Sequence, residues 1–178
     1  MRGALLAVLE YLLGFIALAL FAYLAFGRGP STDESFVFAF KVSSLVAAVE
    51  LGLLLARQSP ANRLIVGANL WLIAGGVAAF LQQWWWLRVY QQFGEASLFA
   101  AIFLVGVYFT LSSPTGFIAK QGPKPIVRRA SLVLLAAVVA ALLVAIYFRG
   151  NVKFAAVLPI IALSWLNRLL RYRVPSEA

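Results

Sequence analysis

Two long apolar runs joined by a short polar turn constrain this chain more than any other feature of its sequence. The first run covers residues 36–56 (FVFAFKVSSLVAAVELGLLLA) and the second covers residues 64–86. Each is long enough to cross the hydrocarbon core of a bilayer as an α-helix, which takes about 20 apolar residues. The turn between them (RQSPANR) is too short to hold structure of its own. The pattern therefore predicts a transmembrane helical hairpin.

The composition extends this prediction to the whole chain. Of the 178 residues, 63% are hydrophobic and 12% are charged, whereas soluble domains have about 45–50% and 25%. A soluble fold of this length could not bury so much apolar surface. Cysteine and histidine are both absent, which excludes disulfides, thiol nucleophiles and the usual zinc, copper and haem ligands. We therefore expect no metal site and no cofactor.

Four further apolar runs complete the predicted topology. The six predicted spans cover residues 3–26, 36–56, 64–86, 97–113, 131–148 and 152–170. The first run is longer than the core of a secretory signal, about 7–15 residues, and we expect it to be an uncleaved span. Pro159 should kink the last span or loosen its first turns. No loop is long enough for a soluble domain, so we expect one all-α transmembrane domain over residues 1–178, a bundle of about six helices.

The basic residues lie at the ends of the apolar runs and predict the orientation of the chain. The net charge of +9 comes from 15 Lys and Arg against 6 Asp and Glu. One predicted side carries ten of them: Arg2, Arg57, Arg63, Lys120, Lys124, Arg128, Arg129, Arg168, Arg171 and Arg173. The other side carries five: Arg28, Lys41, Arg88, Arg149 and Lys153. The positive-inside rule places the richer side, which holds both termini, in the cytoplasm. We expect a multi-pass protein of a bacterial inner (plasma) membrane, without nucleic-acid binding.

Three polar side chains fall well inside the apolar runs. Glu10 lies in the first run, Glu50 in the second and Asn69 in the third. At about 1.5 Å of rise per residue, all three lie roughly 8–11 Å from the cytoplasmic ends of their predicted helices. We therefore expect them to share one layer in the inner leaflet. Because a carboxylate at the centre of a spanning helix costs roughly 2.5–3.5 kcal/mol on insertion scales, these side chains should face the bundle interior and find partners.

This layer has two interpretations. Two ionised carboxylates in one layer would repel, so at least one of Glu10 and Glu50 should be protonated, which suits a proton or ligand site. Alternatively, a neutral Glu and Asn69 form a hydrogen-bonded clamp between helices, or Glu10 extends to water near the end of its helix. Arg168, in the last predicted span, is a possible counter-charge for either carboxylate.

A basic loop follows the fourth run. It contains Lys120, Lys124, Arg128 and Arg129 among proline and glycine residues. Such a cluster beside a membrane predicts contact with anionic lipid headgroups. Docking of a cytoplasmic partner is the alternative interpretation.

The sequence carries no recognisable catalytic motif, so we expect no enzyme. Without histidine there is no Ser–His pair, and the single aspartate, Asp33, falls in a predicted loop. Paired acidic motifs and phosphate-binding glycine patterns are also missing. Two functional classes remain. The first is a small transport or permeation protein for a small solute, ion or proton. The second is a non-catalytic integral subunit or assembly partner of a larger membrane complex.

Overall fold

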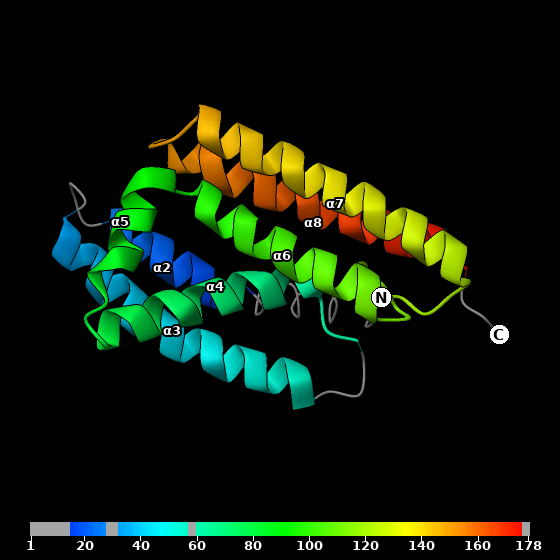
Figure 1. Cartoon of the computed structure of the whole chain (residues 1–178), viewed down its shortest axis with the longest axis horizontal. Helices are drawn as coiled ribbons and strands as arrows, with labels where there is room; N and C mark the ends of the chain where they lie inside the picture. The colour runs from blue at the N-terminus through cyan, green and yellow to red at the C-terminus, as the bar shows by residue number, and fades with distance from the viewer. Residues whose placement is uncertain (1–14, 28–31, 57–59, 176–178) are drawn as a thin grey trace. The chain divides into compact units, whose positions relative to one another are not determined.

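The computed structural model of the chain describes residues 15–27, 32–56 and 60–175 (Figure 1). Helices account for 82% of these residues, which include no β-strand. Four helical segments are long and apolar enough to cross a membrane: α3 (Asp33–Ala56), α4 (Arg63–Phe80), α7 (Lys124–Tyr147) and the segment Lys153–Arg173. The predicted all-α class is therefore confirmed, and the four apolar segments are compatible with an integral membrane protein.

Two apolar helices are shorter than a typical span. Helix α2 (Ile16–Phe26) has 11 residues and α6 (Ala96–Ser112) has 17. A further short helix, α5 (Trp84–Phe93), occupies the connection between α4 and α6. Six spanning helices and cytoplasmic termini thus stay predictions.

The chain divides into two compact units, and α4 contributes residues to both. Unit 1 comprises Met1–Arg57 and Asn69–Arg88. Unit 2 comprises Gln58–Ala68 and Val89–Ala178.

In unit 1, α2 and α3 pack against each other in antiparallel directions. The ring centroids of Phe26, at the end of α2, and Phe36, near the start of α3, are 5.3 Å apart. At the opposite end of the pair, Ala17 of α2 contacts Glu50 of α3. This packing brings the start of α2 to the middle of the apolar stretch of α3.

An aromatic cluster and a close helix contact hold α4 in unit 1. The ring centroid of Phe21 lies 4.6 Å from that of Phe40 and 5.4 Å from that of Trp71. The centroids of Phe40 and Trp71 are 5.2 Å apart. Helix α4 continues without a break through the glycine pair Gly75 and Gly76. A Cβ at Gly76 would meet the side chain of Ser44 on α3. The glycine pair therefore serves close packing of α4 on α3 and does not interrupt the helix.

The predicted third span, residues 64–86, is two helices. Helix α4 ends at Phe80, and Gln82 adopts a left-handed conformation with φ of 55°. The Gln83 N–H donates to the Ala78 carbonyl at 2.7 Å, which is the six-to-one hydrogen bond of a Schellman C-cap. This cap stops the helix, and α5 begins at Trp84.

In unit 2, α7 packs against both α6 and α8 (Leu158–Arg173) (Figure 1). Helix α7 begins at Lys124, so the end of the segment predicted as a basic loop forms its first turns. Pro125 suits the first turn of a helix, where its missing N–H has no intrahelical partner to lose. The start of α4 packs on α6, because a Cβ at Gly67 would lie 2.9 Å from the Ile102 Cα.

The predicted loosening before Pro159 is confirmed. Residues Lys153–Val157 form a π-helical turn, η1, in which the Leu158 N–H donates to the Lys153 carbonyl. Pro159 has no N–H, so it cannot bond the carbonyl of Ala155 in an α-helical pattern. The wider turn replaces the α-helical pattern immediately before the proline.

Candidate functional site

The carboxylate of Glu50 joins α2 and α4 to α3 within unit 1. Its Oε1 accepts a hydrogen bond from the Ala17 N–H at 3.0 Å, and its Oε2 accepts one from Asn69 Nδ2 at 3.2 Å. Ala17 and Asn69 are buried, and Glu50 is half-buried. The structure therefore brings together two of the three polar residues that the sequence placed in one layer.

The bond to Ala17 arises because α2 begins inside the predicted first span. Phe15 is the N-cap residue, with φ of −114° and ψ of 9°, and its side chain makes no capping hydrogen bond. The first N–H groups of a helix have no intrahelical acceptor, and the positive end of its dipole favours a negative charge. Glu50 thus caps α2 from another helix.

Asn69 has an unused hydrogen-bond acceptor beside this carboxylate. The side chain is 1% exposed, and its Oδ1 has no hydrogen-bond partner among the residues that the structure describes. An amide group presents two donors on Nδ2 and an acceptor on Oδ1. Nδ2 can donate to an ionised Glu50, and after rotation of the amide Oδ1 can accept from a protonated Glu50. The pair therefore has a hydrogen bond for each protonation state.

The structure does not place the other two residues proposed for this site relative to Glu50. Glu10 is outside the residues that the structure describes. Arg168 is exposed on α8 in unit 2, whereas Glu50 belongs to unit 1. Their roles as a second acid and a counter-charge stay predictions.

The four basic residues proposed to contact lipid or a partner lie at the start of α7 and just before it. Lys124, Arg128 and Arg129 are exposed on the first turns of α7, and Lys120 is half-buried in the preceding segment. Exposure of three of these cations suits a surface that meets anionic groups, and this contact also stays a prediction.

The structure shows a buried arginine whose contacts the sequence did not indicate. Arg63, at the start of α4, is 8% exposed. Its Nη1 donates to the Gly116 carbonyl, and its Nη2 donates to Ser113 Oγ at 2.9 Å and Thr115 Oγ1 at 2.6 Å. The guanidinium lies 4.1 Å from the centroid of the Phe109 ring. Arg63 therefore fastens the start of α4 to the end of α6 and the turn that follows it.

A half-buried amide, Asn62, immediately precedes Arg63 in the sequence. Asn62 Oδ1 accepts from the Leu64 N–H and from Asn167 Nδ2, both at 3.2 Å. Asn62 thereby caps α4 and joins it to α8. Asn167 is 2% exposed, and within the described part of the chain its Oδ1 has no hydrogen-bond partner.

These features define an all-helical protein with apolar helices of membrane-spanning length and one carboxyl–amide pair between helices. In the described part of the chain, no group of three or more acidic, histidine or cysteine side chains could hold a metal ion. No protein family, curated protein or solved structure matches the chain.

Proposed function

We propose that this chain is a small polytopic membrane protein that transports or passes a small solute, ion or proton through a site built on Glu50 and Asn69. Among these, a proton is the species that the carboxyl–amide pair fits best. The proposed site lies in the apolar interior of unit 1, where a titratable side chain is costly and commonly functional.

One observation carries the proposal: the Glu50 carboxylate sits at the N-terminus of a helix that begins inside an apolar run. In many secondary transporters, binding sites near the middle of the membrane are formed by discontinuous helices whose N-termini point at anionic groups. The bond from the Ala17 N–H to Glu50 Oε1 has this arrangement. An unbroken first span would have offered no free N–H at this depth.

The chemistry of Asn69 allows it to form a hydrogen bond with Glu50 in either protonation state of the acid. With Glu50 ionised, Asn69 Nδ2 donates to Oε2. When a proton arrives on Oε2, the acid becomes a donor, and rotation of the amide turns Oδ1 toward it. The hydrogen bond to Ala17 on Oε1 persists in both states, so the helix contact is kept while the proton is exchanged.

The remaining topology belongs to the same proposal. Six spans with both termini in the cytoplasm agree with the ten-to-five distribution of basic residues under the positive-inside rule. In this topology, the proposed site lies in the inner leaflet of the plasma membrane.

The test is proton flux into liposomes that contain the purified full chain and an entrapped pH-sensitive dye. A step in external pH at a clamped potential should give a faster internal pH change than in protein-free liposomes. Glu50→Gln should fold and lower this flux by about tenfold or more, because the amide cannot ionise. Glu34→Gln is the matched control, since Glu34 is exposed in the first turn of the same helix and should leave the flux unchanged.

Flux of the Glu50→Gln protein equal to that of the wild type would refute the proposed site. Wild-type liposomes that pass neither protons, Na⁺ nor K⁺ faster than empty liposomes would refute a role in proton or ion permeation.

The alternative is a non-catalytic integral subunit or assembly partner of a larger membrane complex. It is supported by the observation that both Glu50 oxygens already have protein donors, as a structural clamp would. This alternative predicts that Glu50→Gln lowers the thermal stability of the purified chain and its co-purification with a partner, with no flux to lose.

A further inference from the structure

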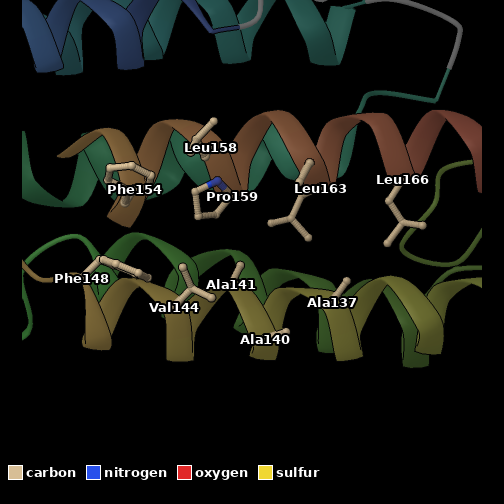
Figure 2. Close-up of a pocket in the computed structure, with 11 residues that line it drawn as sticks. Ala137, Ala140, Ala141, Val144, Phe148, Phe154, Leu158, Pro159, Leu163 and Leu166 are labelled. Carbon is tan, nitrogen blue, oxygen red and sulfur yellow. The ribbon is translucent and has the colours of Figure 1, made fainter. Parts of the chain in front are cut away.

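A groove of about 370 Å³ lies between α7 and the η1–α8 segment in unit 2, and only apolar side chains line it (Figure 2). The α7 side presents small side chains, and the opposite side carries the proline that follows the π-helical turn. Its lining includes Ala137, Ala140, Ala141, Val144, Pro159 and Leu163.

The sequence explains why two helices in contact leave this space. Alanine at three positions on one side of α7 removes the side-chain volume that would fill the interface. On the other side, η1 holds its hydrogen bonds from residue i+5 to residue i, which widens the turn before Pro159. Figure 2 shows Pro159 and Leu163 facing the alanine side of α7.

We propose that this groove binds one acyl chain of an anionic glycerophospholipid. Its length is the first argument. From Ala137 to Phe148 the helix rises roughly 16 Å, about half of the 30 Å hydrocarbon core of a bilayer. One acyl chain of a single leaflet has this depth, whereas a spanning helix of a partner would need a groove of the full thickness.

The residues at the end of the groove supply the second argument. Phe148 and Phe154 close it, with ring centroids 5.5 Å apart. The neighbouring residue Lys153 is an exposed cation. A chain lying in the groove would bring its phosphate to this end, where nearby positive charge favours an anionic headgroup.

This inference requires membrane insertion but does not depend on transport through Glu50. The groove lies in unit 2, whereas Glu50 lies in unit 1. Lipid labelling and proton flux are separate measurements, so one proposal can fail while the other stands.

The test uses the full chain in nanodiscs of phosphatidylcholine that contain phosphatidylglycerol with a photoreactive diazirine in its acyl chain. After illumination and digestion, mass spectrometry should find the label concentrated on peptides of residues 137–148 and 154–166. Ala140→Leu fills the groove and should reduce this labelling by about fivefold. Ala136→Leu is the matched control, because Ala136 is exposed on α7 but does not line the groove, and it should leave labelling unchanged.

A headgroup comparison completes the test. The wild type should be labelled more strongly by the phosphatidylglycerol probe than by a phosphatidylcholine probe with the same chain. Lys153→Gln should reduce this preference. Equal labelling of the two alanine variants, or label spread evenly over the exposed apolar helix faces, would overturn the proposal in favour of ordinary surrounding lipid. Photocrosslinked pairs of this chain joined through α7 and α8 would overturn it in favour of a second copy.

Discussion

Asn69 in unit 1 and Asn167 in unit 2 have nearly the same burial and hydrogen-bond geometry, but their partners differ. Each amide is at most 2% exposed and donates one hydrogen bond of 3.2 Å from Nδ2, and no described residue bonds its Oδ1. Asn69 donates to the carboxylate of Glu50, whereas Asn167 donates to the amide of Asn62. An unused acceptor is therefore not in itself a sign of function in this protein.

The difference lies in what each partner can do. Glu50 can gain a proton and become a donor to Oδ1, whereas the Asn62 amide has one protonation state at physiological pH. The neighbouring charge in unit 2, Arg63, is held by a carbonyl, two hydroxyls and an aromatic ring. A guanidinium does not deprotonate in proteins. The first region thus contains a group that can change its protonation state, whereas the hydrogen bonds of the second region join helices.

Of the substitutions that test this comparison, Arg63→Met should cause the largest loss of stability. The change leaves the Gly116 carbonyl without its donor, and hydrogen bonds to charged groups contribute about 1.5–3 kcal/mol each, so we expect about 3 kcal/mol of lost stability. Thermal or denaturant unfolding in detergent measures it. Arg88→Met, at an exposed position of α5, should change stability little. Proton flux per folded molecule should not change, and a selective loss of flux would break the division between the two regions.

A smaller effect is expected where α4 packs on α3 beside the proposed site. Gly76→Ala places a Cβ against the side chain of Ser44, and overpacking of this kind costs about 1–3 kcal/mol. Gly52→Ala is the control, because no described atom beyond its own turn of helix lies within 4 Å of its Cβ position. This substitution should stabilise α3 by up to about 1 kcal/mol. Equal unfolding temperatures for the two variants would contradict the close packing.

The smallest change in stability, and the sharpest contrast, should come from the two asparagines. Asn69→Leu removes a donor from the Glu50 carboxylate and should cost about 1–2 kcal/mol, whereas Asn167→Leu should cost less than about 1 kcal/mol because Asn62 still caps α4. Only Asn69→Leu should alter the dependence of proton flux on pH. The same liposome assay measures this dependence, and an equal response of the two variants would remove the distinction.

The contact between Glu50 and Asn69 could be predicted because both residues are polar interruptions of long apolar runs. Their distances from the helix ends follow from the helical rise alone. The bond to Ala17 could not be predicted, because it depends on where α2 begins. Gly14 is the only weak signal for a break in that run, and an isolated glycine is tolerated within many helices.

The role of Arg63 was hidden for a different reason. In the sequence it is one of several cations at the end of an apolar run, and its partners are some 50 residues away. Two of those partners are hydroxyls and one is a backbone carbonyl, so no acidic residue marks the pair. Pro159, by contrast, was informative because the loss of its N–H has a local effect, and the structure shows that effect in η1.

The π-helical turn also affects how the last helix would respond to a change in chain length. Such a turn is an α-helix with one extra residue inserted. Deleting one residue from Lys153–Val157 would remove that insertion. Ser164 and Asn167 would then keep the orientation that they have now. A deletion further along α8 would rotate the following residues by about 100° and turn Asn167 away from Asn62. The hairpin of α7 and α8 can therefore lose a residue at one place only without losing its register.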